Sequence, residues 1–346
     1  MSKQVNQYVV TKQSGILLNA NESTENLSQQ IQNEIGKEVY KIAYNRYPDN
    51  SQEELLEAYS KIAEVNPKQL LAGNGSDQML GLLISKYLGK GKTLYTFSPD
   101  FSMYDYYASS YEADILKFPL EQDGSLDIDA FIKYGNEKNV DLVMFSNPNN
   151  PTGHCLNIAE IEKIVSSFKN QVVVVDEAYY EFSDEVSAIT LLNQYPNLYV
   201  TRTLSKAYCL AGMRVGFMIS NVANIDAMKE IAVPYALNSG SMKVATIVLK
   251  HVNEFKEKFE KTKQERDTFY QKVKGLKAIR FVKSQTNFLY GYCLQQDELV
   301  GLFAKKNIVI RNYEGKKAIR ITIGSEEENA MVLSVLEEFE RSQTCA

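Results

Sequence analysis

The stretch QVVVVDEAYYEF, residues 171–182, indicates the fold of this chain most directly. Four consecutive valines predict a short strand buried on both faces, which is typical of a parallel sheet covered by helices on either side. Further apolar runs are KTLYTFS (92–98), DLVMFS (141–146), NLYVTRT (197–203) and VGFMIS (215–220). Helical patterns such as SQEELLEAYSKIAEV (51–65) and SDQMLGLLISKYL (76–88) alternate with them. This alternation predicts an α/β fold of three layers with a mostly parallel central sheet.

The pattern changes after about residue 240. A long charged helix is expected over roughly 241–274, followed by the short strands FLYGYC, IVIRN and KAIRITIG and a final helix. This order suits a smaller α+β domain. The first 35 residues are polar and predict an arm and a helix. We therefore expect an arm that belongs in part to the small domain at 1–35, a large domain at 36–240 and a small domain at 241–346.

Composition narrows the classes of function. The chain has 346 residues, a net charge of −5 and no basic patch, which argues against nucleic-acid binding. No apolar stretch has the length of a signal peptide or a membrane span, so the cytoplasm is the expected location. Two histidines and four cysteines without a CxxC pair predict free thiols and no metal site. The cysteines are Cys155, Cys209, Cys293 and Cys345.

Polar residues that follow the predicted strands are candidates for chemistry, because ligands of open α/β sheets bind beyond the carboxyl ends of the strands. Lys206 comes directly after NLYVTRT among small and apolar residues, where a lowered amine pKa would suit covalent chemistry with a carbonyl. Asp176 ends the valine strand and needs a cationic partner, such as a protonated pyridine nitrogen. Tyr179 lies three residues on. Taken alone, the lysine also fits a solvated loop and the aspartate a helix cap or an ion pair.

Other motifs supply groups for an anion and an aromatic ring. In AGNGSDQ (72–78), glycines allow close backbone approach and the following helix begins with amides that bind anions. Arg214 and Ser205 could add phosphate contacts. Asn150, in the turn NPNNPTG, could donate to a phenolic oxygen, and Phe101 could stack on a ring. Each also fits an ordinary role, namely a capped helix, a structural turn or a core aromatic.

Taken in order, the motifs YNRYPD, AGNGSDQ, SNPNNPTG, VVVVDEAYYEF, RTLSKAYCLAGMRVGF and IRITIG resemble those of fold-type-I enzymes that use pyridoxal 5′-phosphate (PLP). Together with LLNANES near the N-terminus, they most resemble those of the histidinol-phosphate aminotransferases. The resemblance covers about residues 16–340. It implies the PLP-dependent transferase fold and PLP as cofactor.

The resemblance also implies roles for residues at matching positions. Lys206 would bind PLP covalently and later move a proton, and Asp176 would pair with the pyridine nitrogen. Tyr179 and Asn150 would hydrogen-bond the O3′ atom, and Phe101 would stack on the ring where the family usually has a tyrosine. The expected phosphate group contacts are Gly75, Ser76, Asp77, Thr203, Ser205 and Arg214.

For substrates, the resemblance implies histidinol phosphate and the pair glutamate/2-oxoglutarate, in histidine biosynthesis. Arg320 and Arg311 would bind the carboxylate and phosphate groups in turn, since a guanidinium fits either anion. Asn21, in LLNANES, would also contact the substrate. Tyr47, in YNRYPD, would reach the cofactor phosphate of a neighbouring subunit, so the resemblance implies a homodimer.

One feature departs from the family. Its members carry a Pro-Tyr pair ahead of the LNANE-like motif, and its tyrosine helps bind the substrate phosphate. Here Tyr8 has no preceding proline and lies at a different spacing.

Three alternatives therefore stay open. The first is an aromatic or broad-range aminotransferase. The second is a threonine-phosphate decarboxylase of cobalamin synthesis, against which DEAY in place of DEAF and Ala211 in place of proline argue. The third is a PLP-binding protein that is not an enzyme, although Lys206 and Asp176 are both present.

Overall fold

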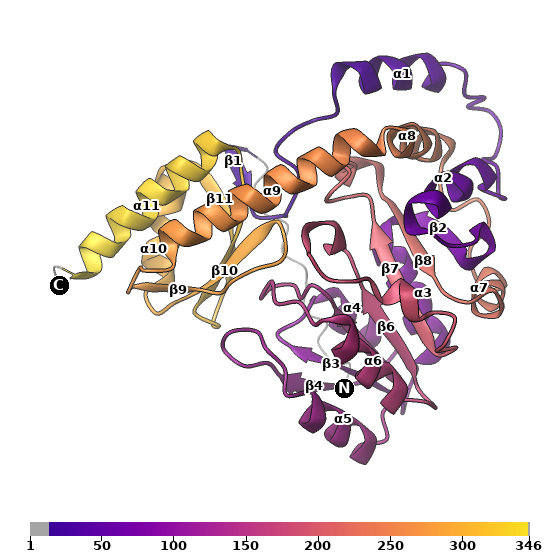
Figure 1. Ribbon diagram of the computed structural model, residues 1–346, viewed down its shortest axis with the longest axis horizontal. Helices are drawn as coiled ribbons and strands as arrows, with labels where there is room; N and C mark the ends of the chain where they lie inside the picture. Colours follow the sequence, from indigo (N-terminus) through magenta and orange to yellow (C-terminus); the bar gives the residue numbers. More distant parts are fainter. Residues whose placement is uncertain (1–13, 345–346) are drawn as a thin grey trace.

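Two sheets organise the chain, of which the computed structural model describes residues 14–344 (Figure 1). The larger sheet has seven strands in the order β2-β8-β7-β6-β5-β3-β4. Strand β8 runs antiparallel to both neighbours, and the other six are parallel to one another. The strands are β2 (Leu70–Asn74), β3 (Thr93–Ser98), β4 (Asp114–Pro119), β5 (Leu142–Ser146), β6 (Val172–Asp176), β7 (Leu198–Thr203) and β8 (Val215–Ile219).

Helices cover both faces of the large sheet. Because side chains alternate along a strand, Val173 and Val175 of β6 enter one core and Val174 enters the other. The first core is completed by α1 (Gln29–Val39), α2 (Glu53–Ala63), α5 (Ile128–Glu137), α6 (Ile158–Ser167) and α8 (Ser239–Lys250). The second is completed by α3 (Gly75–Tyr87), α4 (Met103–Ser110) and α7 (Val222–Lys229). The predicted three-layer α/β fold is thereby confirmed.

The smaller sheet joins the two ends of the described chain. Its order is β1-β11-β12-β10-β9, and β1 near the N-terminus pairs in parallel with β11. Its core includes side chains of α9, which runs from the large sheet to the small one (Figure 1). The elements are β1 (Ile16–Leu18), α9 (Val252–Val273), β9 (Ile279–Phe281), β10 (Phe288–Cys293), α10 (Gln296–Lys305), β11 (Ile308–Tyr313), β12 (Ala318–Thr322) and α11 (Glu326–Thr344).

The prediction of a single helix over 241–274 is wrong. The structure has two helices, α8 and α9, that meet at His251, whose backbone leaves the helical region with φ −101° and ψ 26°. The His251 ring lies 2.8 Å from the Glu34 carboxylate on α1, so the break coincides with a tertiary contact. Residues of α8 pack into the core of the large sheet. The domain limits at 35 and 240 stay a prediction.

Short 3₁₀ turns complete the described backbone, at Pro67–Gln69, Tyr180–Phe182, Ala188–Leu191 and Ala211–Met213. Within residues 14–344, no helix combines the length and apolar character that crossing a membrane requires. The thiols of Cys155, Cys209 and Cys293 are free, as expected, and Cys345 lies outside the described residues.

The parallel strands bring their carboxyl ends to one edge of the large sheet. Ser146 at the end of β5 lies opposite Asp176 at the end of β6, and Asp176 lies opposite Thr201 of β7. The loop after β7 begins at Leu204, three residues after Thr201, and carries Lys206. The sheet itself therefore places the predicted catalytic residues side by side.

One aromatic pair fixes α2 against the large sheet and gives a test of the core. The rings of Tyr59 on α2 and Phe217 on β8 are stacked with centroids 3.7 Å apart, and both are fully buried. Phe217→Ala should lower the free energy of unfolding by about 3–5 kcal/mol, because it removes a large buried ring and leaves a cavity. Urea unfolding measures this change. Leu294→Ala, at a side chain that is 72% exposed, should stay within about 0.5 kcal/mol of the parent. A Phe217→Ala protein as stable as Leu294→Ala would contradict this account.

Candidate active site

A cavity of about 790 Å³ lies at the carboxyl edge of the large sheet and is closed on one side by the small sheet. Its walls come from three regions of the chain: the segment after β1, the strand ends with α4, and the hairpin of β11 and β12. The lining residues are Ala20, Asp77, Pro99, Asp100, Phe101, Ser102, Met103, Tyr106, Tyr107, Asn150, Tyr179, Lys206, Arg311, Tyr313, Lys316 and Arg320. Seven of the fifteen predicted site residues line this cavity, namely Asp77, Phe101, Asn150, Tyr179, Lys206, Arg311 and Arg320.

Lys206 is a partly buried amine at the floor of this cavity. Its Nζ donates a hydrogen bond to the Ala20 backbone oxygen at 2.7 Å. Loss of water, reinforced by the positive charge of Arg320, lowers the Lys206 pKa to about 8. A larger fraction of this amine is neutral at physiological pH than for a solvated lysine. A neutral amine is the form that attacks a carbonyl carbon.

Asp176 is a carboxyl group that is almost completely removed from water. It accepts hydrogen bonds from the hydroxyls of Tyr104 and Thr201, both at 2.9 Å. Burial raises the Asp176 pKa to about 6, and these two hydrogen bonds oppose that shift. A cation at this carboxyl group would favour its charged form. Tyr104 and Thr201 were not predicted, although the pairing of neighbouring strands could have indicated Thr201.

Tyr179, Asn150 and Asn21 form a connected polar group above Asp176. The Tyr179 hydroxyl accepts hydrogen bonds from Asn21 Nδ2 at 2.9 Å and from Asn150 Nδ2 at 3.5 Å. Burial raises the Tyr179 pKa to about 12, so the phenol stays protonated. Asn21 is fully buried with φ of 56°, a conformation that asparagine tolerates better than most residues. Thr322 of β12 holds it by bonding its backbone nitrogen.

The start of α3 and the loop after β7 build an anion cradle. Arg214 reaches Ser205 Oγ at 3.2 Å and the Asp77 carboxylate at 2.9 Å, and the Thr203 hydroxyl lies 2.9 Å from Ser205 Oγ. Gly75 has φ of 77°, and a Cβ added there would lie 2.7 Å from Arg214 Nη2. Ser76 follows in the first turn of α3, whose free amides favour anions. All six predicted phosphate contacts therefore lie together.

Positive charges occupy the wall formed by the small sheet. Arg320 on β12 and Arg311 on β11 lie opposite each other in register, and Lys316 lies on the turn that joins these strands. The buried Arg320 donates to Asn150 Oδ1 at 2.5 Å and to the Asn19 backbone oxygen at 2.8 Å. Its Nε is buried without a hydrogen-bond partner among the described residues. The wall can receive an anion, and the sequence analysis did not include Lys316.

Phe101 lines the cavity from the loop after β3. Its ring meets the Tyr104 ring edge-on, with centroids 5.6 Å apart. Phe101 is thereby packed against the residue whose hydroxyl donates to Asp176. Neighbouring Tyr106 and Tyr107 also line the cavity and were not predicted.

The predicted residue Tyr47 lies away from these groups. Tyr47 is 83% exposed and stacks on Tyr235 with ring centroids 5.0 Å apart. It lies outside the set of cavity residues of its own chain. Tyr8 falls outside the described residues.

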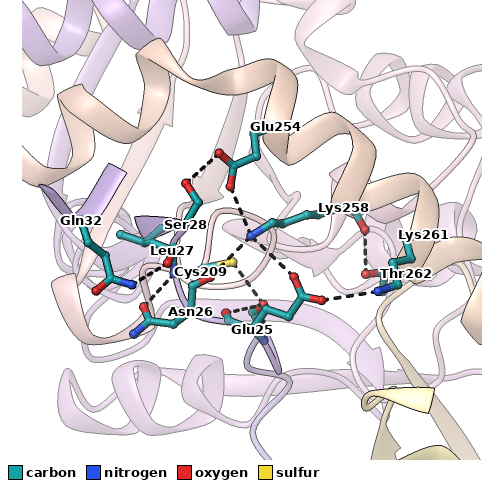
Figure 2. Close-up of polar contacts among 11 residues, drawn as sticks. Glu25, Asn26, Leu27, Ser28, Gln32, Cys209, Glu254, Lys258, Lys261 and Thr262 are labelled. Atoms are coloured by element: carbon teal, nitrogen blue, oxygen red, sulfur yellow. Dashed lines mark hydrogen bonds and ion pairs between the residues drawn. The ribbon is translucent and has the colours of Figure 1, made fainter. Parts of the chain in front are cut away.

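The segment that follows Asn21 is fastened to α9 (Figure 2). Glu25 lies between Lys258 and Lys261, at 3.7 and 3.5 Å from their ammonium nitrogens. Ser28 donates to the Glu254 carboxylate at 3.0 Å, and the Cys209 thiol contacts the Ser23 hydroxyl at 3.1 Å. These contacts hold residues 19–28 across the loop that carries Lys206.

Comparison with known proteins gives consistent matches. A family model described as aminotransferase class I and II matches residues 13–336. A curated relative, histidinol-phosphate aminotransferase of Clostridium novyi (strain NT), is 34% identical over 93% of this chain and 90% of its own length.

Two solved structures share the fold. Histidinol-phosphate aminotransferase from Sinorhizobium meliloti, in complex with pyridoxal-5′-phosphate, has a TM-score of 0.86 at 23% identity, covering 95% of this chain and 91% of that one. L-threonine-O-3-phosphate decarboxylase from Porphyromonas gingivalis has a TM-score of 0.81 at 22% identity, covering 94% and 99%. The resemblance found in the ordered motifs is thus confirmed over nearly the whole sequence, and the chain belongs to the family of class I and II aminotransferases.

Proposed function

We propose that the chain is a PLP-dependent transaminase that transfers the amino group of histidinol phosphate to 2-oxoglutarate. The observation that carries this proposal is the placement of a partly neutral lysine amine and a buried carboxyl group at the ends of neighbouring strands. Family membership supports amino-group transfer, and the name of the curated relatives supports the substrate.

The described residues fit PLP at three points. Lys206 offers a primary amine with a lowered pKa for the cofactor aldehyde. Asp176 offers a buried carboxyl group, which accepts hydrogen bonds from the hydroxyls of Tyr104 and Thr201, for the pyridine nitrogen. The anion cradle, crowded enough that an added Cβ at Gly75 would meet Arg214, offers amides, hydroxyls and a guanidinium for the phosphate group. When bound, PLP supplies an electron sink for charge that develops at the substrate Cα.

The protein residues then have distinct tasks. Lys206 Nζ would hold the cofactor and, when free, would move a proton at the substrate Cα. Asp176 would keep the pyridine nitrogen protonated. Tyr179 and Asn150 would donate to O3′, and Phe101 would cover one face of the ring.

The cationic wall supports a substrate that alternates between two anions. Glutamate and 2-oxoglutarate bring carboxylates, and histidinol phosphate brings a phosphate monoester in their place. Arg320 and Arg311 lie side by side, and either guanidinium fork can pair with carboxylate or phosphate oxygens. Asn21, which donates to the Tyr179 hydroxyl, completes the set of residues proposed to bind the substrate.

A homodimer forms part of the proposal. Tyr47 is exposed in its own subunit, and Tyr40 and Tyr44 nearby are 88% and 77% exposed. Large exposed aromatic side chains are typical of surfaces that bind a partner. Tyr47 would thereby reach the cofactor phosphate of the second subunit. We further propose that the dimer works in the cytoplasm.

The lysine gives the most direct test of the cofactor. Lys206→Ala should abolish the visible absorbance of covalently attached PLP and lower turnover by at least about 10³-fold, since it removes the attachment point and the proton carrier. Absorbance spectra and a coupled assay measure both effects. Lys169→Ala, at an exposed position just after α6, is the matched control and should behave as the parent. Normal turnover in Lys206→Ala would refute the proposed mechanism.

The cradle gives a test that does not depend on turnover. A Cβ added at Gly216 would collide with the backbone nitrogen of Ser76, whereas one added at Gly212 meets no atom within 4 Å. Gly216→Ala should therefore displace the start of α3 and weaken PLP binding by at least about 10-fold, the cost of one disturbed charged hydrogen bond. Gly212→Ala should bind PLP as the parent does. Equal affinities of the two variants, measured by fluorescence titration, would place the phosphate group elsewhere.

The substrate is tested by comparing amino donors with 2-oxoglutarate as acceptor. One charged contact to a phosphate group contributes about 1.5–3 kcal/mol, so kcat/KM for histidinol phosphate should exceed that for phenylalanine by about 10- to 100-fold. Equal values would indicate a broad-range aminotransferase, and release of carbon dioxide from threonine phosphate would indicate a decarboxylase. Arg320→Lys should raise KM for 2-oxoglutarate by about 10-fold or more, because an ammonium cannot form the bidentate pair.

A further inference from the structure

The cavity contains a second carboxyl group that the proposed mechanism does not use. Asp100 follows β3 and lines the cavity beside Phe101. Every hydrogen bond that it accepts comes from a neutral group: the Phe101 backbone nitrogen at 2.7 Å, the Ser146 backbone nitrogen at 3.2 Å, and the hydroxyls of Ser146 and Thr96. A carboxyl group surrounded in this way is costly to ionise once the cavity is filled.

The partners of Asp100 connect it to both sides of the cofactor site. Asp100 accepts a hydrogen bond from the backbone nitrogen of Phe101, and Phe101 lies on one wall of the cavity. Ser146 Oγ, which donates to Asp100, accepts in turn from the Asn150 backbone nitrogen at 2.9 Å and from Asn149 Nδ2 at 3.3 Å. Asp100 is therefore hydrogen-bonded directly to Phe101, which is proposed to stack on the ring. Through the Ser146 hydroxyl it is connected to Asn150, which is proposed to bind O3′.

Asp100 also lies close to the carboxyl group that serves the pyridine nitrogen. Loss of water raises the pKa of Asp100 to about 8, and the negative charge of Asp176 acts in the same direction. Tyr104 donates to Asp176, and both carboxyl groups raise the pKa of this phenol. Tyr104 and Asp176 act electrostatically on or with Asp100. The other charged and titratable groups that line the cavity with Asp100 are Asp77, Tyr106, Tyr107, Tyr179, Lys206, Arg311, Tyr313, Lys316 and Arg320.

We propose that Asp100 is a positioning residue of this site, which as a neutral acid holds Phe101 and, through Ser146, Asn150 in place against the cofactor. The inference rests on the proposed function, because it assigns Phe101 and Asn150 to PLP. The neutral acid can share one proton with Ser146 or Thr96 while its oxygens accept the two backbone N–H groups. Two ionised carboxylates so close together would repel each other.

Asp100→Asn tests the proposal, with Asp105→Asn as the matched control. Asp105 lies on the adjacent helix α4, where it pairs with Lys117 away from the cavity. An asparagine at position 100 would point its amide N–H group at the N–H and O–H groups that donate to Asp100 in the parent. PLP should therefore leave Asp100→Asn about 10-fold faster than it leaves the parent or Asp105→Asn. Dissociation is measured by transfer of released PLP to an excess of a scavenging apoenzyme.

A second measurement uses the protein without PLP and reports on ionisation. The pKa of Asp100 in the folded chain lies above its unfolded value, so its contribution to stability is complete at low pH and is lost as pH rises toward about 8. Between pH 6 and 8 the fall in Tm should be smaller in Asp100→Asn, by about half, than in the parent and in Asp105→Asn. A purely structural aspartate with an ordinary pKa would not change this slope.

Each outcome decides the inference. If Asp100→Asn matches Asp105→Asn in a parent protein that binds PLP, the inference is wrong and the proposed function stands. A parent protein that takes up no PLP overturns both. If Asp100→Asn does not fold, Ser146→Ala breaks the same link from the other end: a similar acceleration of PLP release supports the link, and release at the parent rate overturns it.

Discussion

This site depends on one constraint: the ionisable groups at the carboxyl ends of β6 and β7 are buried away from water. Asp176 is buried because the valines that precede it are covered on both faces of the sheet. An ionised carboxylate in that position needs compensation, which the described residues provide through neutral groups, namely the hydroxyls of Tyr104 and Thr201 and the Ala178 backbone N–H. Loss of water also disfavours the charged form of Lys206, one strand away, and therefore lowers the pKa of its amine. A cofactor with a basic ring nitrogen and an aldehyde relieves both penalties at once.

The small sheet completes the site by way of the N-terminal segment. Pairing of β1 with β11 leads the chain directly into Asn19, Ala20 and Asn21. Their backbone and side-chain groups reach Arg320, Lys206 and Tyr179 in turn. Polar contacts between residues 23–28 and α9 then hold this segment down (Figure 2). The active site thus lies between the two sheets, and its shape depends on β1, a strand of only three residues.

The sequence predicts the strand ends well because the signals there are local. Val172–Asp176 is continuous and apolar, and parallel pairing fixes which residues follow it into the site. The weaker strand β4, half exposed along its length, was missed for lack of such a run. Tyr104, Asp100 and Lys316 were missed for a different reason, since nothing in their local sequence reports what they face. The break at His251 coincides with a contact to Glu34, more than 200 residues away, and no helical pattern contains that information.

A buried ion pair beneath the site explains how the two strand ends keep their alignment. Glu177 follows Asp176, and Arg202 lies one residue before the end of β7. The Arg202 guanidinium donates to Glu177 Oε2 from Nε at 2.9 Å and from Nη2 at 2.8 Å, and Ser187 bonds both partners. Such pairs add little net stability compared with apolar packing, but losing one partner costs about 3–5 kcal/mol, so the pair strongly disfavours any slip between the strands. Asp176 and Lys206 therefore owe their relative placement to a charge pair on the far side of the strands that carry them.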